Sequence, residues 1–369
     1  MRFLLLRWLP AALLSIGFLT LTACQATCTR PLVPEERIVS LGFEDVVADP
    51  ARLDQLAARL TEVRATGISI SVGRSDWTAF PWPALRAAES ATVRRTRKDY
   101  VAAAIDALRT DSTGGRRTVN LTIDALVPRW IEEQPSLAGV DPGGTRSEMF
   151  ASLASLQSGA VGERLLSMTE YVVQRYHPDS VSFTELHFDD TTFGADDLQS
   201  YRKFSGRSDW PRTGNGTIAE DDATIAAWRS RAVADLVGRA RAIAKANGVR
   251  LEMDVRVPWG DPAGDRAESG HDYDLLLAAS DRLVLWNYFG LQGKPPSYSA
   301  DLARATQRRA PGRFVMSIGL WAEGEVITPE ELSEAVTASA QGGARAVAVT
   351  PTRLLTPAHW SALRRSWEV

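Results

Sequence analysis

Two neighbouring carboxyl groups, Asp189 and Asp190, follow the apolar and β-branched run 180–188, where a strand is expected to end. Aspartate is a poor strand former and is seldom buried without a partner, so this pair indicates a polar pocket above a sheet. Paired carboxyl groups can cleave a glycosidic bond: one protonates the leaving oxygen, while the other attacks the anomeric carbon or activates water. Glu323, in the segment 320–324, is a candidate partner.

The elements that must position these groups alternate along the chain. Eight β-branched runs predict strands at 38–45, 68–74, 118–125, 180–188, 250–257, 282–288, 314–320 and 344–349. Helical patterns occupy 50–65, 97–109, 147–176, 218–247, 273–279, 298–309, 329–341 and 357–367. Strands that alternate with helices in a chain of this length predict an α/β fold, a (β/α)₈ TIM barrel. An open doubly wound parallel sheet is the alternative, although no glycine-rich phosphate loop follows any strand.

Polar and apolar residues alternate within several predicted strands. Because side chains of a strand point to opposite faces in turn, the apolar set packs on helices and the polar set faces the barrel interior. The predicted interior positions are Ser40, Gly42, Glu44, Asn120, Thr122, Asp124, Glu185, His187, Asp189, Glu252, Asp254 and Arg256. A lumen rich in carboxyl groups follows.

The reactive groups of such barrels lie at the carboxyl ends of the strands. Asp189 and Asp190 end the fourth predicted strand, and Glu323 follows the seventh, so we expect them to face each other across the mouth as catalytic groups. Aromatic residues gather at the same ends, and their flat faces suit sugar rings. The predicted sugar-binding residues are Glu44, Asp124, Glu185, His187, Asp254, Arg256, Asn287, Tyr288 and Trp321.

Each of these residues also has a structural interpretation. Asp190, followed by two threonines, can cap a turn, and Asp189 or Asp254 can pair with Arg256 inside the lumen. Glu323 can be a solvated loop residue.

Residues 182–190 carry a family resemblance: an apolar strand, then histidine or an aromatic residue, then Asp-Asp. This segment resembles the glycoside-hydrolase-like barrels of bacterial exopolysaccharide systems, particularly the C-terminal hydrolase domain of poly-N-acetylglucosamine deacetylases. The resemblance implies that one aspartate of the pair is the general acid. Many retaining barrel enzymes carry Asn-Glu after strand four, and this chain departs from that pattern. The four histidines lack the spacing of a zinc-dependent deacetylase domain.

The N-terminus has the pattern of a bacterial lipoprotein signal. A basic and apolar segment, 1–23, ends at the lipobox Leu21-Thr22-Ala23-Cys24, where Cys24 is expected to be acylated. A transmembrane helix is the alternative, but Pro10 interrupts the run and leaves it short. We expect residues 24–36 to be a tether and 37–369 a single barrel domain with loop insertions near 127–162 and 201–220. The protein is then exported and held at the bacterial membrane or envelope.

Composition narrows the function further. The net charge of −3 disfavours a nucleic-acid partner, and acylation of Cys24 leaves Cys28 without a disulfide partner. We expect a monomer without metal or cofactor. The prediction is a membrane-anchored glycoside hydrolase acting on a cell-envelope or extracellular polysaccharide. The alternatives are a non-catalytic glycan-binding lipoprotein and, third, a metal-dependent hydrolase using His187, Asp189 and Asp254.

Overall fold

The computed structural model describes residues 32–47 and 50–368. The predicted signal segment, Cys24 and most of the predicted tether lie outside these residues. Within the described ranges, no helix combines the length and apolar character that crossing a membrane requires.

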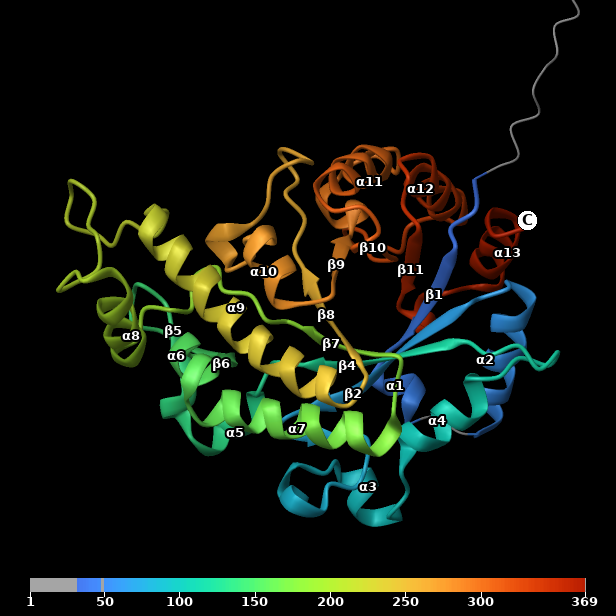
Figure 1. The fold of residues 1–369 in the computed structure, drawn as a ribbon, viewed down its shortest axis with the longest axis horizontal. Helices are drawn as coiled ribbons and strands as arrows, with labels where there is room; N and C mark the ends of the chain where they lie inside the picture. Colours follow the sequence, from blue (N-terminus) through green and yellow to red (C-terminus); the bar gives the residue numbers. More distant parts are fainter. Residues whose placement is uncertain (1–31, 48–49, 369) are drawn as a thin grey trace, which may run out of the picture. The chain divides into compact units, whose positions relative to one another are not determined.

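Eight parallel strands form the closed barrel (Figure 1). Closure is direct, because the first strand pairs with the second and also with the last, through Ile38↔Gly67 and Val39↔Val349. The TIM barrel is therefore confirmed and the open sheet is wrong. The barrel strands are β1 (Glu36–Leu41), β2 (Gly67–Arg74), β4 (Thr118–Asp124), β7 (Ser180–Thr184), β8 (Arg250–Val255), β9 (Arg282–Asn287), β10 (Phe314–Gly319) and β11 (Ala346–Thr350).

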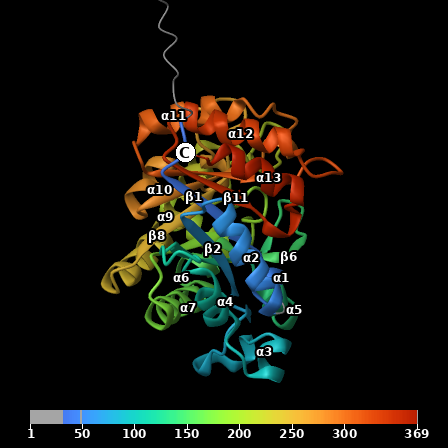
Figure 2. The same ribbon diagram turned by 90° about the vertical axis from the view of Figure 1, so that its right-hand side faces the viewer.

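Helices surround the strands (Figure 2). Three of them, α10 (Tyr273–Ala279), α11 (Tyr298–Arg309) and α12 (Pro329–Gln341), begin and end where the sequence predicts. The start of α12 is well defined because Thr328 and Glu331 form a reciprocal capping box before a first-turn proline. The other helices are α1 (Phe43–Val46), α2 (Pro50–Glu62), α3 (Ala91–Thr96), α4 (Tyr100–Leu108), α5 (Pro128–Glu133), α6 (Leu153–Ser158), α7 (Ala160–Tyr176), α8 (Ala195–Ser205), α9 (Ala223–Ala246) and α13 (Pro357–Ser366).

The predicted single helix over 147–176 is wrong in its first part. Residues 146–151 form β6 (Arg146–Ala151), which pairs in an antiparallel hairpin with β5 (Ala138–Val140). The helical stretch starts only after Ser152, whose hydroxyl accepts the Ser155 backbone N–H and caps α6. A hairpin therefore lies inside the segment predicted as a loop insertion.

The alternation of polar and apolar residues has the predicted consequence. In β4, Val119, Leu121 and Ile123 are fully buried on the helix side, while Asn120 and Thr122 face the lumen. In a typical TIM barrel, bulky branched residues fill this space. Here Ile38, Ile68, Val284 and Val315 fill only part of it, and small hydroxyl and amide side chains line the rest, so the lumen stays partly open.

Candidate active site

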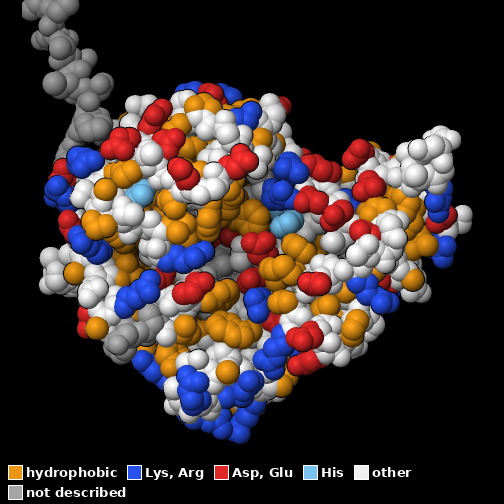
Figure 3. Space-filling model, turned by 180° about the vertical axis from the view of Figure 1, so that it is seen from behind, with side chains coloured by type: hydrophobic (Ala, Val, Ile, Leu, Met, Phe, Trp, Pro, Cys, Tyr) orange, Lys and Arg blue, Asp and Glu red, His pale blue; other side chains and the backbone are white. Residues whose placement is uncertain are grey.

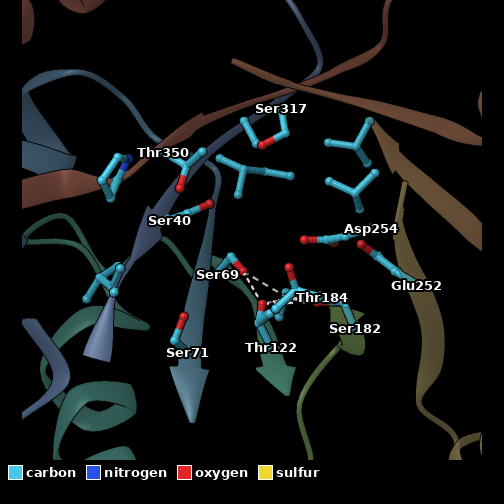
Figure 4. Close-up of a pocket in the computed structure, with 18 of the residues that line it drawn as sticks. Ser40, Ser69, Ser71, Thr122, Ser182, Thr184, Glu252, Asp254, Ser317 and Thr350 are labelled. Atoms are coloured by element: carbon cyan, nitrogen blue, oxygen red, sulfur yellow. Dashed lines mark hydrogen bonds between the residues drawn. The ribbon is translucent and has the colours of Figure 1, made fainter. Parts of the chain in front are cut away.

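A cavity of about 270 Å³ runs along the barrel lumen to the carboxyl ends of the strands. Its middle is lined by hydroxyl groups that bond one another (Figure 4). Ser69 Oγ lies 2.9 Å from Asn120 Oδ1 and 2.9 Å from Thr122 Oγ1, which in turn lies 3.0 Å from Ser182 Oγ. Figure 3 shows a hollow near the middle of one face, bordered by charged and hydrophobic side chains.

Three carboxyl groups line this cavity at or near the carboxyl ends of neighbouring strands. Asp124 ends β4, Glu185 directly follows β7, and Asp254 lies near the end of β8. The strands pair in the order β4, β7, β8, so the groups share one side of the lumen. Glu44 joins the lining from α1 rather than from the first strand, which ends at Leu41.

Asp254 has the properties of a proton donor. Its side chain is partly accessible from the cavity and points into it (Figure 4). Burial raises the pKa of Asp254 to about 7, although hydrogen bonds from Trp286 and Thr184 act in the other direction. The Trp286 Nε1–H donates to Asp254 Oδ2 at 3.2 Å. Asp254 is thus substantially protonated at neutral pH, which ordinary aspartates are not.

Asp124 is more enclosed. One of its oxygens accepts the Leu126 backbone N–H at 2.8 Å, and the residue is 8% exposed. Burial raises its pKa to about 7, and the negative charge of Glu185 adds to this effect. Asp124 is therefore better placed to bind a sugar hydroxyl than to exchange protons freely.

Glu185 occupies a strained backbone position. Its φ of 57° lies in the left-handed region, which a residue with a Cβ seldom adopts. Such conformations persist only where the surroundings impose them, and they cluster at functional sites. The turn brings the Glu185 carboxyl group to the cavity. The side chain is 36% exposed, and its Oε2 lies 3.4 Å from His187 Nε2.

Aromatic rings form one wall of the site. Trp286 and Tyr288 stack at 5.7 Å between ring centroids with an interplanar angle of 12°, and Trp321 lies 5.1 Å from Tyr288. Burial raises the pKa of Tyr288 well above its ordinary value, so its hydroxyl remains a hydrogen-bond donor. The wall offers apolar faces beside polar groups, as a sugar ring requires.

The residues predicted as the catalytic set lie elsewhere. Asp189, Asp190 and Glu323 are exposed and are not among the residues that line the cavity. Burial favours protonation of Asp189, but the Ser269 hydroxyl at 2.6 Å and the Arg256 guanidinium lower its pKa overall. A carboxyl group with a lowered pKa is ionised at neutral pH and is a poor proton donor. The structural interpretation of Asp189, a pair with Arg256, is the one the structure shows.

Glu323 lies farther out than the expected facing arrangement requires. Strands β7 and β10 are three positions apart in the closed ring of eight, so they do lie on roughly opposite sides of the lumen. Glu323 lies in a turn beyond β10, next to Gly324, and its side chain faces solvent.

Among the predicted sugar-binding residues, Glu44, Asp124, Glu185, Asp254, Tyr288 and Trp321 line the cavity. Asn287 does not, because its side chain points outward and donates to Ser299 of α11 at 2.8 Å. Arg256 is held at Asp189 and also lies outside the lining, while His187 stands beside Glu185 at its edge. Successive side chains of a strand point to opposite faces, so Asn287 lies on the other face from Trp286 and Tyr288. This alternation would have excluded Asn287 from the predicted sugar-binding residues.

Two contributors were not predicted as site residues. Trp286, the hydrogen-bond donor to Asp254, was recognised only as one of several aromatic residues at the rim. Glu252 lines the lumen below Asp254 and is held by Arg282, a contact over 30 residues for which the sequence gives no local signal. In the described part of the chain, no group of three or more His, Cys, Asp or Glu side chains could hold a metal ion.

No protein-family model and no curated protein matches the chain. Among solved structures, the chain is similar to the PgaB (BpsB) glycoside hydrolase domain from Bordetella bronchiseptica, with 18% identity and a TM-score of 0.68 over 91% of this chain and 99% of that one. It is also similar to the catalytic domain of β-amylase from Paenibacillus polymyxa, with 11% identity and a TM-score of 0.60 over 90% and 98%.

A third similar structure is a GH42 β-galactosidase from G. stearothermophilus, with 10% identity and a TM-score of 0.61. That alignment covers 90% of this chain and 56% of the other. The resemblance stated from residues 182–190 is thus confirmed at the level of fold: the chain has a TIM barrel of the kind found in glycoside hydrolases.

Proposed function

We propose that this protein is a glycoside hydrolase that cleaves a cell-envelope or extracellular polysaccharide by carboxyl acid and base catalysis. One observation carries the proposal. A carboxyl group with a pKa raised to about 7, Asp254, lies beside a second carboxyl group, Glu185, under an aromatic wall at the carboxyl ends of the strands. A protonated and a second carboxyl group are the two parts that glycoside hydrolysis requires.

In the proposed mechanism, Asp254 donates its proton to the glycosidic oxygen as the bond between this oxygen and the anomeric carbon breaks. The electron pair of that bond stays on the oxygen, and positive charge develops on the sugar. Glu185 then serves as nucleophile toward the anomeric carbon or removes a proton from the attacking water. Asp124 and Tyr288 bind hydroxyl groups, and the rings of Tyr288 and Trp321 hold the sugar face.

A screen for hydrolysis tests the proposal. Soluble starch and β-galactan represent the activities named for two similar structures, and glycol chitin represents N-acetylglucosamine polymers. We expect new reducing ends from at least one of these polymers. Retardation of the protein in a gel that contains the polymer, without release of reducing ends, would instead identify a non-catalytic glycan-binding protein.

We also propose that the enzyme is exported and anchored through a lipid on Cys24, which the lipobox supports. Replacing Cys24 with Ala is expected to move the protein from the membrane fraction to the soluble fraction when cells are separated by centrifugation. Equal membrane association of both forms would contradict the anchor.

The pH dependence of hydrolysis follows from the protonation state of the Asp254 carboxyl group. Because its pKa is raised to about 7, the group is protonated below this pH and loses its proton above it. We expect kcat to fall as the pH rises through about 7, measured as initial rates between pH 4 and 9 in buffers of constant ionic strength. A rate that keeps rising above pH 8 would contradict Asp254 as proton donor.

Trp286→Phe is the matched variant for this profile. It keeps an aromatic ring next to Tyr288 but removes the N–H that stabilises the charged form of Asp254. The pKa of Asp254 should therefore rise, and the alkaline limb should move upward by about one pH unit. A purely structural tryptophan would leave the position of this limb unchanged.

A further inference from the structure

The β5–β6 hairpin carries an aromatic side chain to the edge of the site. Phe150 is half-buried, and its ring lies 5.1 Å from the ring of His187 with an interplanar angle of 64°. The neighbouring Met149 is 46% exposed and is one of the few large apolar side chains open to solvent in the described residues. Neither residue lines the lumen cavity itself.

Phe150 is the first ring of a continuous row. From His187 the row passes to Trp286 at 5.7 Å, then to Tyr288 at 5.7 Å, and ends with Trp321 at 5.1 Å. Every member is partly exposed, so the row does not belong to the fully buried core. Within the row, the ring contacts found among the described residues link successive members, and His187 has one further contact, to the buried ring of His271 at 6.4 Å. The five rings therefore form an extended strip.

The hairpin is fixed in place from two sides. The Val127 backbone N–H donates to Met149 O at 3.0 Å after β4, and the Phe193 N–H donates to Val140 O at 2.8 Å after β7. Residue 139 can only be glycine here, because a Cβ would lie 2.3 Å from the Thr191 carbonyl oxygen. Phe150 therefore has a defined position relative to Glu185 before any ligand binds.

We propose that Phe150 forms a distal sugar subsite, so that the protein binds an internal stretch of a glycan along the aromatic row. This inference rests on the proposed function and adds the type of substrate: a polymer several sugars long, cut within the chain. The bound unit is a sugar that presents an apolar C–H face to Phe150. Binding energy gained there promotes cleavage at Glu185 and Asp254 only in substrates long enough to occupy both places.

The test compares long and short substrates. Phe150→Ala should lower kcat/KM about tenfold for six-sugar oligomers of the polymer cleaved in the screen. For three-sugar oligomers of the same polymer, the effect should stay within about twofold. Phe204→Ala is the matched control, because Phe204 is 45% exposed but lies on α8, outside the aromatic row. An equal loss on both lengths, or no loss on either, would overturn the subsite.

Binding without turnover separates this inference from the proposed function. If wild-type protein cleaves none of the polymers, its retardation in gels that contain glycol chitin, soluble starch or β-galactan is measured instead. Weaker retardation of Phe150→Ala than of Phe204→Ala supports the subsite even when hydrolysis fails. Absence of retardation for the wild type in all three gels contradicts it.

Discussion

Replacing Asp254 with Asn lowers kcat by about a thousandfold, the range expected for loss of a general acid. Asparagine has the same shape and can keep its contacts with Trp286 and Thr184, but it has no proton to give. Initial rates on the polymer cleaved in the screen measure the effect. Thermal unfolding of the variant shows whether the fold is retained.

The matched variant is Asp189→Asn, at one of the two rim carboxyl groups that the sequence offers as the acid. Asp189 is ionised and held by Arg256 and Ser269 outside the cavity lining, so we expect less than about a tenfold loss of kcat. The opposite ranking, with Asp189→Asn inactive and Asp254→Asn active, would return the catalytic role to the rim pair.

Replacing Arg282 with Met lowers the free energy of unfolding by about 3–5 kcal/mol. This guanidinium joins Glu252 in the lumen to Glu36 at the start of β1, with Nη1 2.7 Å from Glu36 Oε1 and Nη2 2.8 Å from Glu252 Oε1. Burial would lower the pKa of Arg282, but the charges and hydrogen bonds of Glu252 and Glu36 outweigh burial and raise it. With methionine at position 282, Glu252 stays charged but loses its partner, and only 3% of this residue is exposed to solvent. Urea unfolding measures the difference.

Two further variants identify the cause of this loss. Arg282→Met combined with Glu252→Met removes both charges of the buried pair, so much of the lost stability should return. Arg345→Met breaks the pair between Arg345 and Glu35, whose side chains are 62% and 63% exposed, and should leave the free energy of unfolding nearly unchanged. A double variant as unstable as the single one would show that packing, rather than the unpaired charge, is responsible.

The barrel could be predicted because its signals are local. Eight β-branched runs alternate with helical patterns, and boundary residues such as Thr328 and Glu331 define helix starts through hydrogen bonds within one turn. The same local logic failed at residues 146–151, where a helical pattern gave way to a hairpin. The hairpin is held by backbone hydrogen bonds from Val127, which follows β4, and from Phe193, which follows β7. Both residues lie outside the hairpin's own sequence.

The site was predicted only in part. The alternation of side chains along a strand correctly predicted that Asp124 and Asp254 face the lumen, because this alternation is a property of the strand itself. It also suggested that strand four continues to Asp189, but β7 ends at Thr184 and Glu185 turns into the left-handed region. One changed backbone angle ends the alternation and leaves Asp189 at the rim.

The sequence alone determined the barrel, the polar lumen and the residue types available for chemistry, because these depend on patterns within single elements. Only the tertiary structure decided which of the many carboxyl groups carry a proton near neutral pH, Asp124 and Asp254 among them. That property depends on burial and on charges from other strands: Asp254 is enclosed beside Glu185 and Trp286, whereas Asp189 meets Arg256 and solvent. The Asp-Asp pair marked the correct strand end, and the cavity beside it contains the groups suited to catalysis.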